Sequence, residues 1–93
     1  MKIYISGAIT NNPNYIEQFN EAENVLKSLG HKVINPVALN AFPFNYQEFM
    51  QICFKLIDLS DGIYMLNGWE NSKGANAELS YANALGKNVY YQV

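Results

Sequence analysis

Residues 68–85 read GWENSKGANAELSYANAL, and this stretch indicates the class of fold. An apolar run, residues 63–66, leads into a polar loop containing Gly68 and Gly74, and the loop enters an alanine-rich segment. A strand that ends in such a loop and continues into a helix is typical of α/β proteins, where anions and nucleotides bind at this place. Ser72 and the backbone of Gly74 can donate hydrogen bonds there, and Glu78 adds a carboxylate about one turn into the helix. The stretch therefore predicts a ligand crevice.

Alternating strand and helix patterns extend over the rest of the chain. Runs of β-branched and aromatic residues predict strands over residues 2–6, 31–35, 62–66 and 88–93. Apolar residues at helical spacing predict helices over residues 15–29, 46–59 and 73–85. Residues 37–45 follow Pro36 and contain Pro43 and two Phe, so they predict an irregular loop over the sheet edge or over a pocket.

The order βαβαβαβ predicts an α/β fold, a flavodoxin- or Rossmann-like three-layer sandwich formed by a single domain over residues 1–93. Right-handed crossovers place the four parallel strands in the order 2-1-3-4, with the three main helices on the two faces. The order changes direction between the first and third strands, so a crevice is expected at their carboxyl ends. The residues expected to converge there are Tyr4, Ser6, Gly7, Ala8, Asn67, Trp69, Ser72, Gly74 and Glu78.

Composition and charge exclude several classes of function. The net charge is −2 with six basic residues and no basic run, which argues against a nucleic acid polymer or an anionic membrane as the main partner. A single cysteine, and a start too short for a signal peptide, predict a soluble cytoplasmic protein. No cluster of His, Cys and carboxylate residues has metal-ligand spacing, so neither a metal nor a cofactor is expected.

Three segments together carry a resemblance to a known family. They are KIYISGAIT (residues 2–10), HKVINP (residues 31–36) and GWENSKGANAELSYANALGKNVY (residues 68–90). The chain resembles, over nearly its whole length, the nucleoside 2-deoxyribosyltransferase-like superfamily. More narrowly, it is similar to the small, mostly uncharacterised bacterial and phage branch and to the nucleoside 5′-monophosphate N-glycosidases. The most specific match is Ser72, Gly74 and Glu78, followed by an alanine-rich helix and Gly86-Lys87-Asn88-Val89.

The resemblance implies cleavage of an N-glycosidic bond. In the superfamily, the residue at the position of Glu78 attacks C1′ of a deoxyribose, and the sugar ester then passes to another base or to water. A Ser at position 72, where the transferases carry Asp, implies a 5′-monophosphate substrate held by Ser72, Gly74 and Gly7. The resemblance also implies a homodimer or larger oligomer, because neighbouring subunits complete the site. Under this hypothesis Tyr4, Asn67 and Trp69 line the sugar and base pocket, and Ser6 is a further substrate-binding residue of the crevice. Tyr15 is expected to close on the sugar because it stands at the start of the first helix.

Other readings remain open at this point. Cys53 stands where the family usually has Asp, and the first loop lacks the family's Arg, so a catalytically inactive nucleotide-binding protein, a sensor or a sequestering protein, is the alternative. A third reading is an oligomeric structural module with a vestigial crevice. The aromatic residues 42–49 are expected to cover a pocket or to form an oligomer contact. The helix dipole is expected to keep Glu78 ionised, although a solvated helix-start Glu would show the same pattern. Asp58 and Asp61 are expected at the opposite end of the sheet from the crevice.

Overall fold

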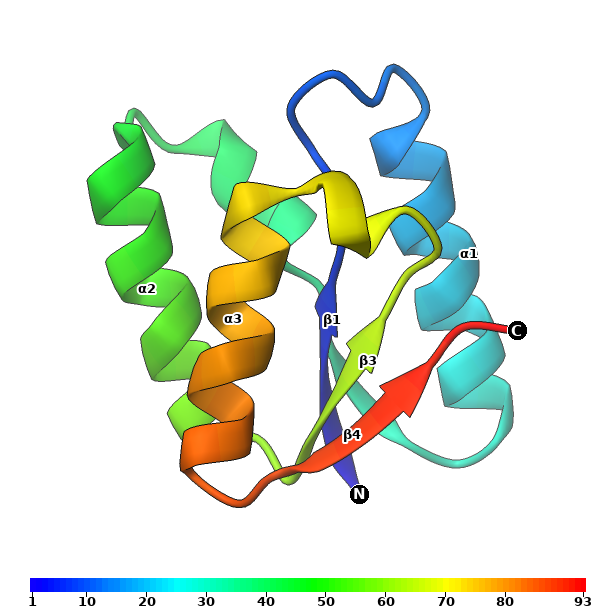
Figure 1. Cartoon of the computed structure of the whole chain (residues 1–93). Coiled ribbons are helices and arrows are strands. Elements are labelled where there is room, and N and C mark those ends of the chain that lie inside the picture. The colour runs from blue at the N-terminus through cyan, green and yellow to red at the C-terminus, as the bar shows by residue number, and fades with distance from the viewer.

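Four parallel strands form one sheet in the order β2-β1-β3-β4 in the computed structural model, which describes residues 1–93 (Figure 1). This order confirms the sequence prediction. The register pairs Tyr4 with both Ile34 and Ile63, so β1 is the central strand and is hydrogen-bonded on both sides. The strands are β1 (Lys2–Ser6), β2 (Lys32–Ile34), β3 (Gly62–Met65) and β4 (Asn88–Tyr91).

Three α-helices cover the two faces of the sheet, as predicted. Helix α1 (Tyr15–Ser28) lies on one face, and α2 (Tyr46–Asp58) and α3 (Lys73–Ala84) lie side by side on the other (Figure 1). No helix of the chain combines the length and the apolar character that crossing a membrane requires.

The segment predicted as an irregular loop is partly helical. Residues Pro36–Ala41 form the 3₁₀ helix η1, and Trp69–Asn71 form a second short one, η2. Asn35 caps η1, because its side-chain oxygen accepts a hydrogen bond from the backbone N–H of Val37 at 3.1 Å. Proline at the first helical position suits a helix start, since its missing N–H would have no partner there. The expectation of a fully irregular loop was therefore wrong for the part before Phe42.

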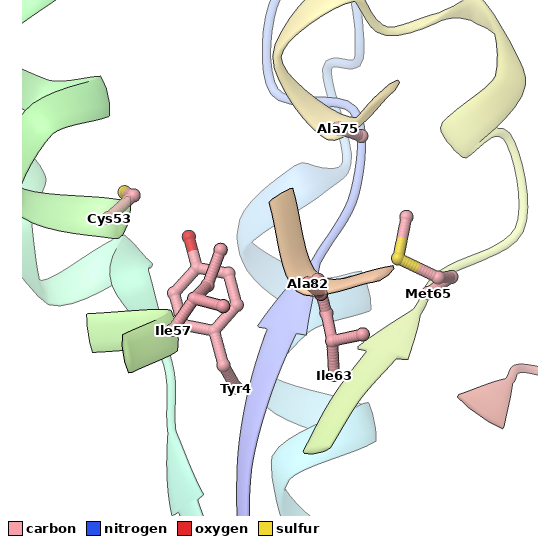
Figure 2. Close-up of a cluster of buried hydrophobic side chains, with 7 residues drawn as sticks. All are labelled: Tyr4, Cys53, Ile57, Ile63, Met65, Ala75 and Ala82. Atoms are coloured by element: carbon pink, nitrogen blue, oxygen red, sulfur yellow. The ribbon is translucent and has the colours of Figure 1, made fainter. Parts of the chain in front are cut away.

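The core divides into two clusters because β1 is buried on both faces. Ile3 and Ile5 point toward α1, where they pack with Phe19 and Leu26. On the opposite face, Tyr4 packs in a cluster with residues of α2, β3 and α3. Figure 2 shows this second cluster, which consists of Tyr4, Cys53, Ile57, Ile63, Met65, Ala75 and Ala82. Alternation along β1 thus sends its even-numbered side chains toward α2 and α3.

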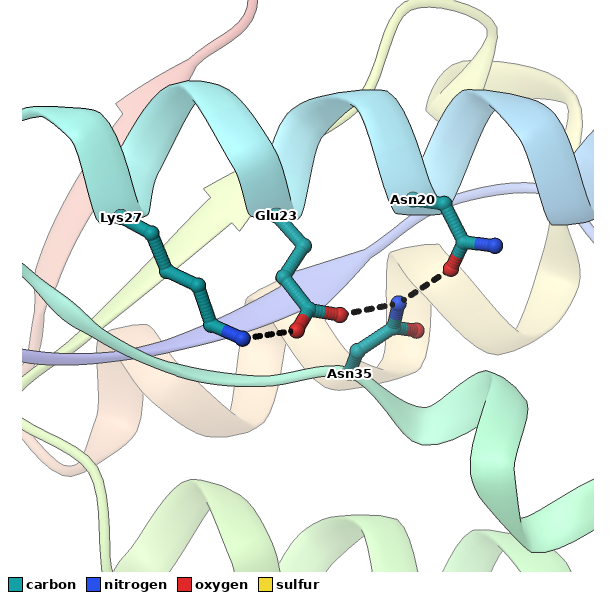
Figure 3. Close-up of polar contacts among 4 residues, drawn as sticks. All are labelled: Asn20, Glu23, Lys27 and Asn35. Carbon is teal, nitrogen blue, oxygen red and sulfur yellow. Dashed lines mark hydrogen bonds and ion pairs between the residues drawn. The ribbon is translucent and has the colours of Figure 1, made fainter.

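A polar cluster attaches α1 to the chain that follows β2 (Figure 3). The side-chain amide of Asn35 donates to Asn20 Oδ1 at 3.0 Å and to Glu23 Oε1 at 2.9 Å. Lys27 pairs with the other Glu23 oxygen at 2.6 Å. The hydrogen bonds from Lys27 and Asn35 lower the pKa of Glu23. These contacts fix the position of η1, which forms part of the wall described below.

Candidate functional site

Glu78 is the central side chain of the site. It is the sixth residue of α3 and only 5% exposed. The hydroxyl of Tyr4 donates to Glu78 Oε2 at 2.7 Å, and the hydroxyl of Ser6 donates to Oε1 at 2.7 Å. Both donors come from β1, whose even-numbered side chains face α3. The carboxylate is therefore held at both oxygens by hydroxyl groups of the central strand.

Burial governs the protonation of Glu78. Desolvation raises its pKa, while the hydrogen bonds from Ser6, Tyr4 and Cys53 act in the opposite direction. The expectation that the helix dipole controls the ionisation of this group was wrong, because the dipole acts mainly within the first turn. Burial has the largest effect on the pKa of Glu78. Glu78 lies beyond that turn and inside the protein. The reading of Glu78 as a solvated helix-start residue is excluded by the same burial.

Tyr4 and Cys53 are protonated neighbours of this carboxylate. Burial, and then the negative charge of Glu78, raise the pKa of Tyr4 well above its ordinary value. The same two causes raise the pKa of Cys53 to about 12. Cys53 is fully buried, and it belongs to the cluster that contains Tyr4 (Figure 2). Its thiol is thus a protonated core group, in line with the sequence interpretation of a buried, unreactive cysteine.

A cavity of about 510 Å³ opens beside Glu78. It lies between the loop after β1, the start of α3, and the segment that runs from η1 into α2. Its lining consists of Tyr4, Ile5, Gly7, Ile9, Thr10, Asn11, Phe19, Pro36, Asn40, Phe44, Asn45, Tyr46, Phe49, Met50, Asn71, Ser72, Lys73, Gly74, Ala75 and Glu78. Among these, only Lys73 and Glu78 carry charge, so the cavity has one cation and one acidic group.

The start of α3 packs closely against α2 and has a capped first turn. Ser72 caps the helix, because its hydroxyl accepts a hydrogen bond from the N–H of Ala75 at 3.1 Å. A side chain at Gly74 would place its Cβ 3.2 Å from the Tyr46 hydroxyl and 3.4 Å from Met50 Sδ. Glycine at this position therefore lets α2 pack against α3. No acidic side chain occupies the first turn of α3, so the N–H groups there face no negative charge from their own helix.

The structure brings most of the sequence-predicted residues together. Tyr4, Gly7, Ser72, Gly74 and Glu78 line the cavity. Ser6, which is fully buried, reaches the cavity only through its hydrogen bond to Glu78.

Four predicted residues lie elsewhere, and one of them, Ala8, lines only a separate hollow. Trp69 packs beside Tyr91 of β4, with ring centroids 6.0 Å apart, because Gly68 adopts a left-handed φ of 92° and turns the chain into η2. Asn67 borders the same hollow as Ala8. Tyr15 packs against the cluster on the α1 face, and its hydroxyl accepts a hydrogen bond from Asn40 at 2.9 Å. The structure does not bring these four to the wall of the main cavity.

The sequence pointed to the aromatic wall of the cavity without singling out its residues, and it did not identify Lys73 as a lining residue. Phe44, Tyr46 and Phe49 come from the aromatic segment that was expected to cover a pocket or an oligomer contact. The capping box of Asn45 and Glu48 positions the start of α2 at this wall, and its N-x-x-E spacing was a readable signal. Lys73 carried no such signal, because a lysine beside a loop is ordinary on a protein surface.

Acidic residues at the other end of the sheet have structural partners. Asp61 accepts a hydrogen bond from the backbone N–H of Lys2 at 2.8 Å, and Asp58 accepts one from Tyr81 at 2.6 Å. Their location agrees with the sequence prediction. No group of three or more His, Cys, Asp or Glu side chains is arranged to hold a metal ion.

Comparisons with known proteins give a family and a fold. A family model described as "Domain of unknown function (DUF4406)" matches residues 1–91. No curated protein matches the chain. The fold is similar to that of two solved structures, a 2-deoxyribosyltransferase from the psychrotolerant bacterium Bacillus psychrosaccharolyticus and one from Leishmania mexicana, each with a TM-score of 0.76 and 24% identity.

The alignments include almost all of this chain. They cover 98% of it and 71% of the bacterial protein, and 97% of it and 62% of the Leishmania protein. The chain therefore spans less than two thirds of the length of the second relative. At this identity the likeness shows the fold, and it confirms the fold that the sequence resemblance implied.

Proposed function

The chain belongs to the family described as a domain of unknown function, DUF4406, and we propose that it cleaves or transfers an N-glycosidic bond of a nucleotide or nucleoside. Glu78 is the nucleophile of this reaction. The observation that carries the proposal is the buried Glu78 carboxylate, held at both oxygens by hydroxyls at 2.7 Å beside a cavity of about 510 Å³. The likeness to two deoxyribosyltransferase structures supports the same chemistry.

A carboxylate in this position suits reaction at an anomeric carbon. As the bond from C1′ to the base nitrogen breaks, its electron pair leaves with the base, and C1′ acquires oxocarbenium character. An oxygen of Glu78 forms a bond to C1′ and gives a sugar ester. Water or a second base then attacks C1′, Glu78 departs as a carboxylate, and the proton lost by the attacking group passes to the base that left. Glu78 is thus an ionised carboxylate before and after the reaction and a neutral ester in the intermediate.

The hydroxyl groups of Tyr4 and Ser6 stabilise the ionised form of Glu78. Burial alone would favour the neutral acid, and hydrogen bonds to the charged form oppose that tendency. Because the pKa of Tyr4 is raised, its hydroxyl keeps its proton and remains a donor to Glu78. The two hydroxyls also fix the rotamer of the carboxylate, which leaves it oriented before a substrate binds.

The far end of the cavity favours a 5′-phosphate. Lys73 is the one cation in its lining, and Ser72 and Gly74 lie beside it at the start of α3. Helix N-termini attract phosphate because their first N–H groups lack acceptors within the helix. The rise from Lys73 to Glu78 is about 7.5 Å along the helix axis, which suits a sugar placed between a phosphate and the nucleophile. The substrate is accordingly a small nucleotide, preferred over the free nucleoside.

A second candidate is a nucleotide-binding protein without turnover. The specific observation in its favour is that Glu78 is the only acidic side chain lining the cavity. Glycosidases usually employ a second carboxyl group to protonate the leaving group. Cys53, at the position where the family resemblance implies an Asp, lies buried behind Tyr4 and outside the lining.

Release of free base tests both candidates. Deoxyribonucleoside 5′-monophosphates and the matching nucleosides are incubated with wild-type protein and with Glu78→Gln, and the free base is separated by chromatography. We expect release by the wild type, none by Glu78→Gln, and faster release from the monophosphates. Glu21→Gln, an exposed change on α1, is the matched control and should retain full activity. Binding without base release by the wild type would contradict the enzyme and support the second candidate.

A further inference from the structure

A second hollow of about 390 Å³ adjoins the main cavity. It lies at the carboxyl ends of β1 and β3, where the loop after β1 and the turn of η2 meet at one end of the sheet (Figure 1). Thr10, Asn11 and Asn71 line both spaces, so the two adjoin at these residues. None of the residues lining the second hollow is charged, and most carry a side-chain amide. We call this space the amide hollow.

The walls of the amide hollow are tied together by hydrogen bonds. The side chain of Asn12 donates to the carbonyl of Ala8 and to Gln18 Oε1, both at 2.9 Å. Gln18 donates in turn to the carbonyl of Asn67 at 2.9 Å, and the N–H of Asn67 donates to Gln92 Oε1 at 2.8 Å. Side chains from the first loop, from α1 and from Gln92, which follows β4, thus hold the end of β3 in place. The segments that border the hollow are therefore joined to one another by hydrogen bonds.

Other polar side chains of the amide hollow take no part in these hydrogen bonds and can bind a ligand. The side chains of Thr10, Asn11, Asn67 and Asn71 make no hydrogen bond within the protein, whereas Asn12 and Gln18 are committed to the walls. Asn11 is held at a left-handed φ of 62°, a conformation that asparagine tolerates better than most residues. Amide and hydroxyl side chains offer both donors and acceptors without charge. They match hydroxyl and amide groups of a ligand better than a further phosphate.

We propose that the amide hollow is a second subsite, which binds an uncharged, hydroxyl-bearing group joined to the substrate through its 5′-phosphate. The inference rests on the proposed function, which places the phosphate at Ser72 and Lys73. Asn71 precedes these residues directly and lines both spaces. The amide hollow therefore begins where the phosphate end of a mononucleotide stops. The preferred ligands are nucleotides extended by a sugar, such as nucleoside diphosphate sugars, and not bare mononucleotides.

Calorimetric binding to the Glu78→Gln protein tests the extension without turnover. Two ligand series are compared: dTMP, dTDP and dTDP-glucose, and AMP, ADP and ADP-ribose. We expect each sugar-bearing ligand to bind roughly 3- to 10-fold more tightly than its own diphosphate, which is the worth of one or two net hydrogen bonds. Adding Asn67→Ala should bring this ratio close to one. Asn83→Ala, an exposed asparagine on α3, is the matched control and should keep the ratio.

The outcomes separate the two hypotheses. Binding of mononucleotides with no gain from the added sugar overturns the second subsite alone. A gain that survives Asn67→Ala also overturns it, because the sugar then lies elsewhere. Failure of all six ligands to bind overturns the proposed function together with the second subsite.

Discussion

Removing the Tyr4 hydroxyl tests how the site controls its carboxylate. In Tyr4→Phe the aromatic ring remains in the core cluster, while the 2.7 Å hydrogen bond to Glu78 Oε2 is lost. That bond favours the ionised form, so its loss raises the pKa of Glu78 further above its ordinary range. A nucleophilic carboxylate must be ionised to react. We therefore expect the acid limb of the pH–rate profile to move to higher pH.

The size of this effect follows from the general strength of a hydrogen bond to a charged group. A hydrogen bond to a charged group contributes about 1.5–3 kcal/mol, and at acidic pH the rate follows the ionised fraction of Glu78. The loss corresponds to a roughly 10- to 150-fold lower kcat/KM on the acid limb. At alkaline pH the carboxylate of both proteins is ionised, so the difference should narrow to a few-fold. Ser6→Ala should behave in the same way, because Ser6 donates at the same distance of 2.7 Å.

The assay is base release between pH 4 and pH 9, together with a ¹³C NMR titration of the Glu78 carboxyl group as a readout independent of turnover. Tyr81→Phe is the matched control, since it removes a hydroxyl that donates to Asp58 at 2.6 Å, away from the cavity. Its pH profile should match that of the wild type. An equal loss of activity by Tyr4→Phe at every pH would refute the reasoning, because it would indicate a packing role. An unchanged Glu78 titration would refute it as well.

Two further predictions concern stability. The folded pKa of Glu78 is raised, so its stabilising contribution is complete below the unfolded value near 4.5 and is lost as the pH rises through the folded pKa. Glu78→Gln should therefore melt several degrees higher than the wild type at pH 8, since about 1 kcal/mol corresponds to ~4–8 °C in a domain of this size. Melting followed by circular dichroism should show no such gain at pH 4. A difference in melting temperature that does not change with pH would contradict this origin. Gly7→Ala would place a Cβ 2.9 Å from Leu66 Cβ in the buried core, so urea denaturation should show a free energy of unfolding lower by ~1–3 kcal/mol. An unchanged denaturation midpoint would contradict this, because the contact would then relax without cost.

Local sequence patterns predicted the elements and their order. The strand and helix spans agree with the structure to within one or two residues at most ends, because apolar spacing and glycine stops are properties of neighbouring residues. The cap at Ser72 was readable for the same reason, since its partner lies three residues away. The predicted order 2-1-3-4 follows from the right-handed crossover rule applied to alternating strands and helices.

The sequence by itself therefore determined the α/β elements, the sheet order and the end of the sheet where a cavity forms. Only the tertiary structure decided that Tyr4 and Ser6 bind Glu78, across separations of 74 and 72 residues. It also decided that Trp69 turns toward β4 and that residues of η1 and α2 complete the wall. Local patterns report which face a side chain takes on its own element. Contacts between elements, and the burial that raises the pKa of Glu78, arise only when β1, α2 and α3 pack together.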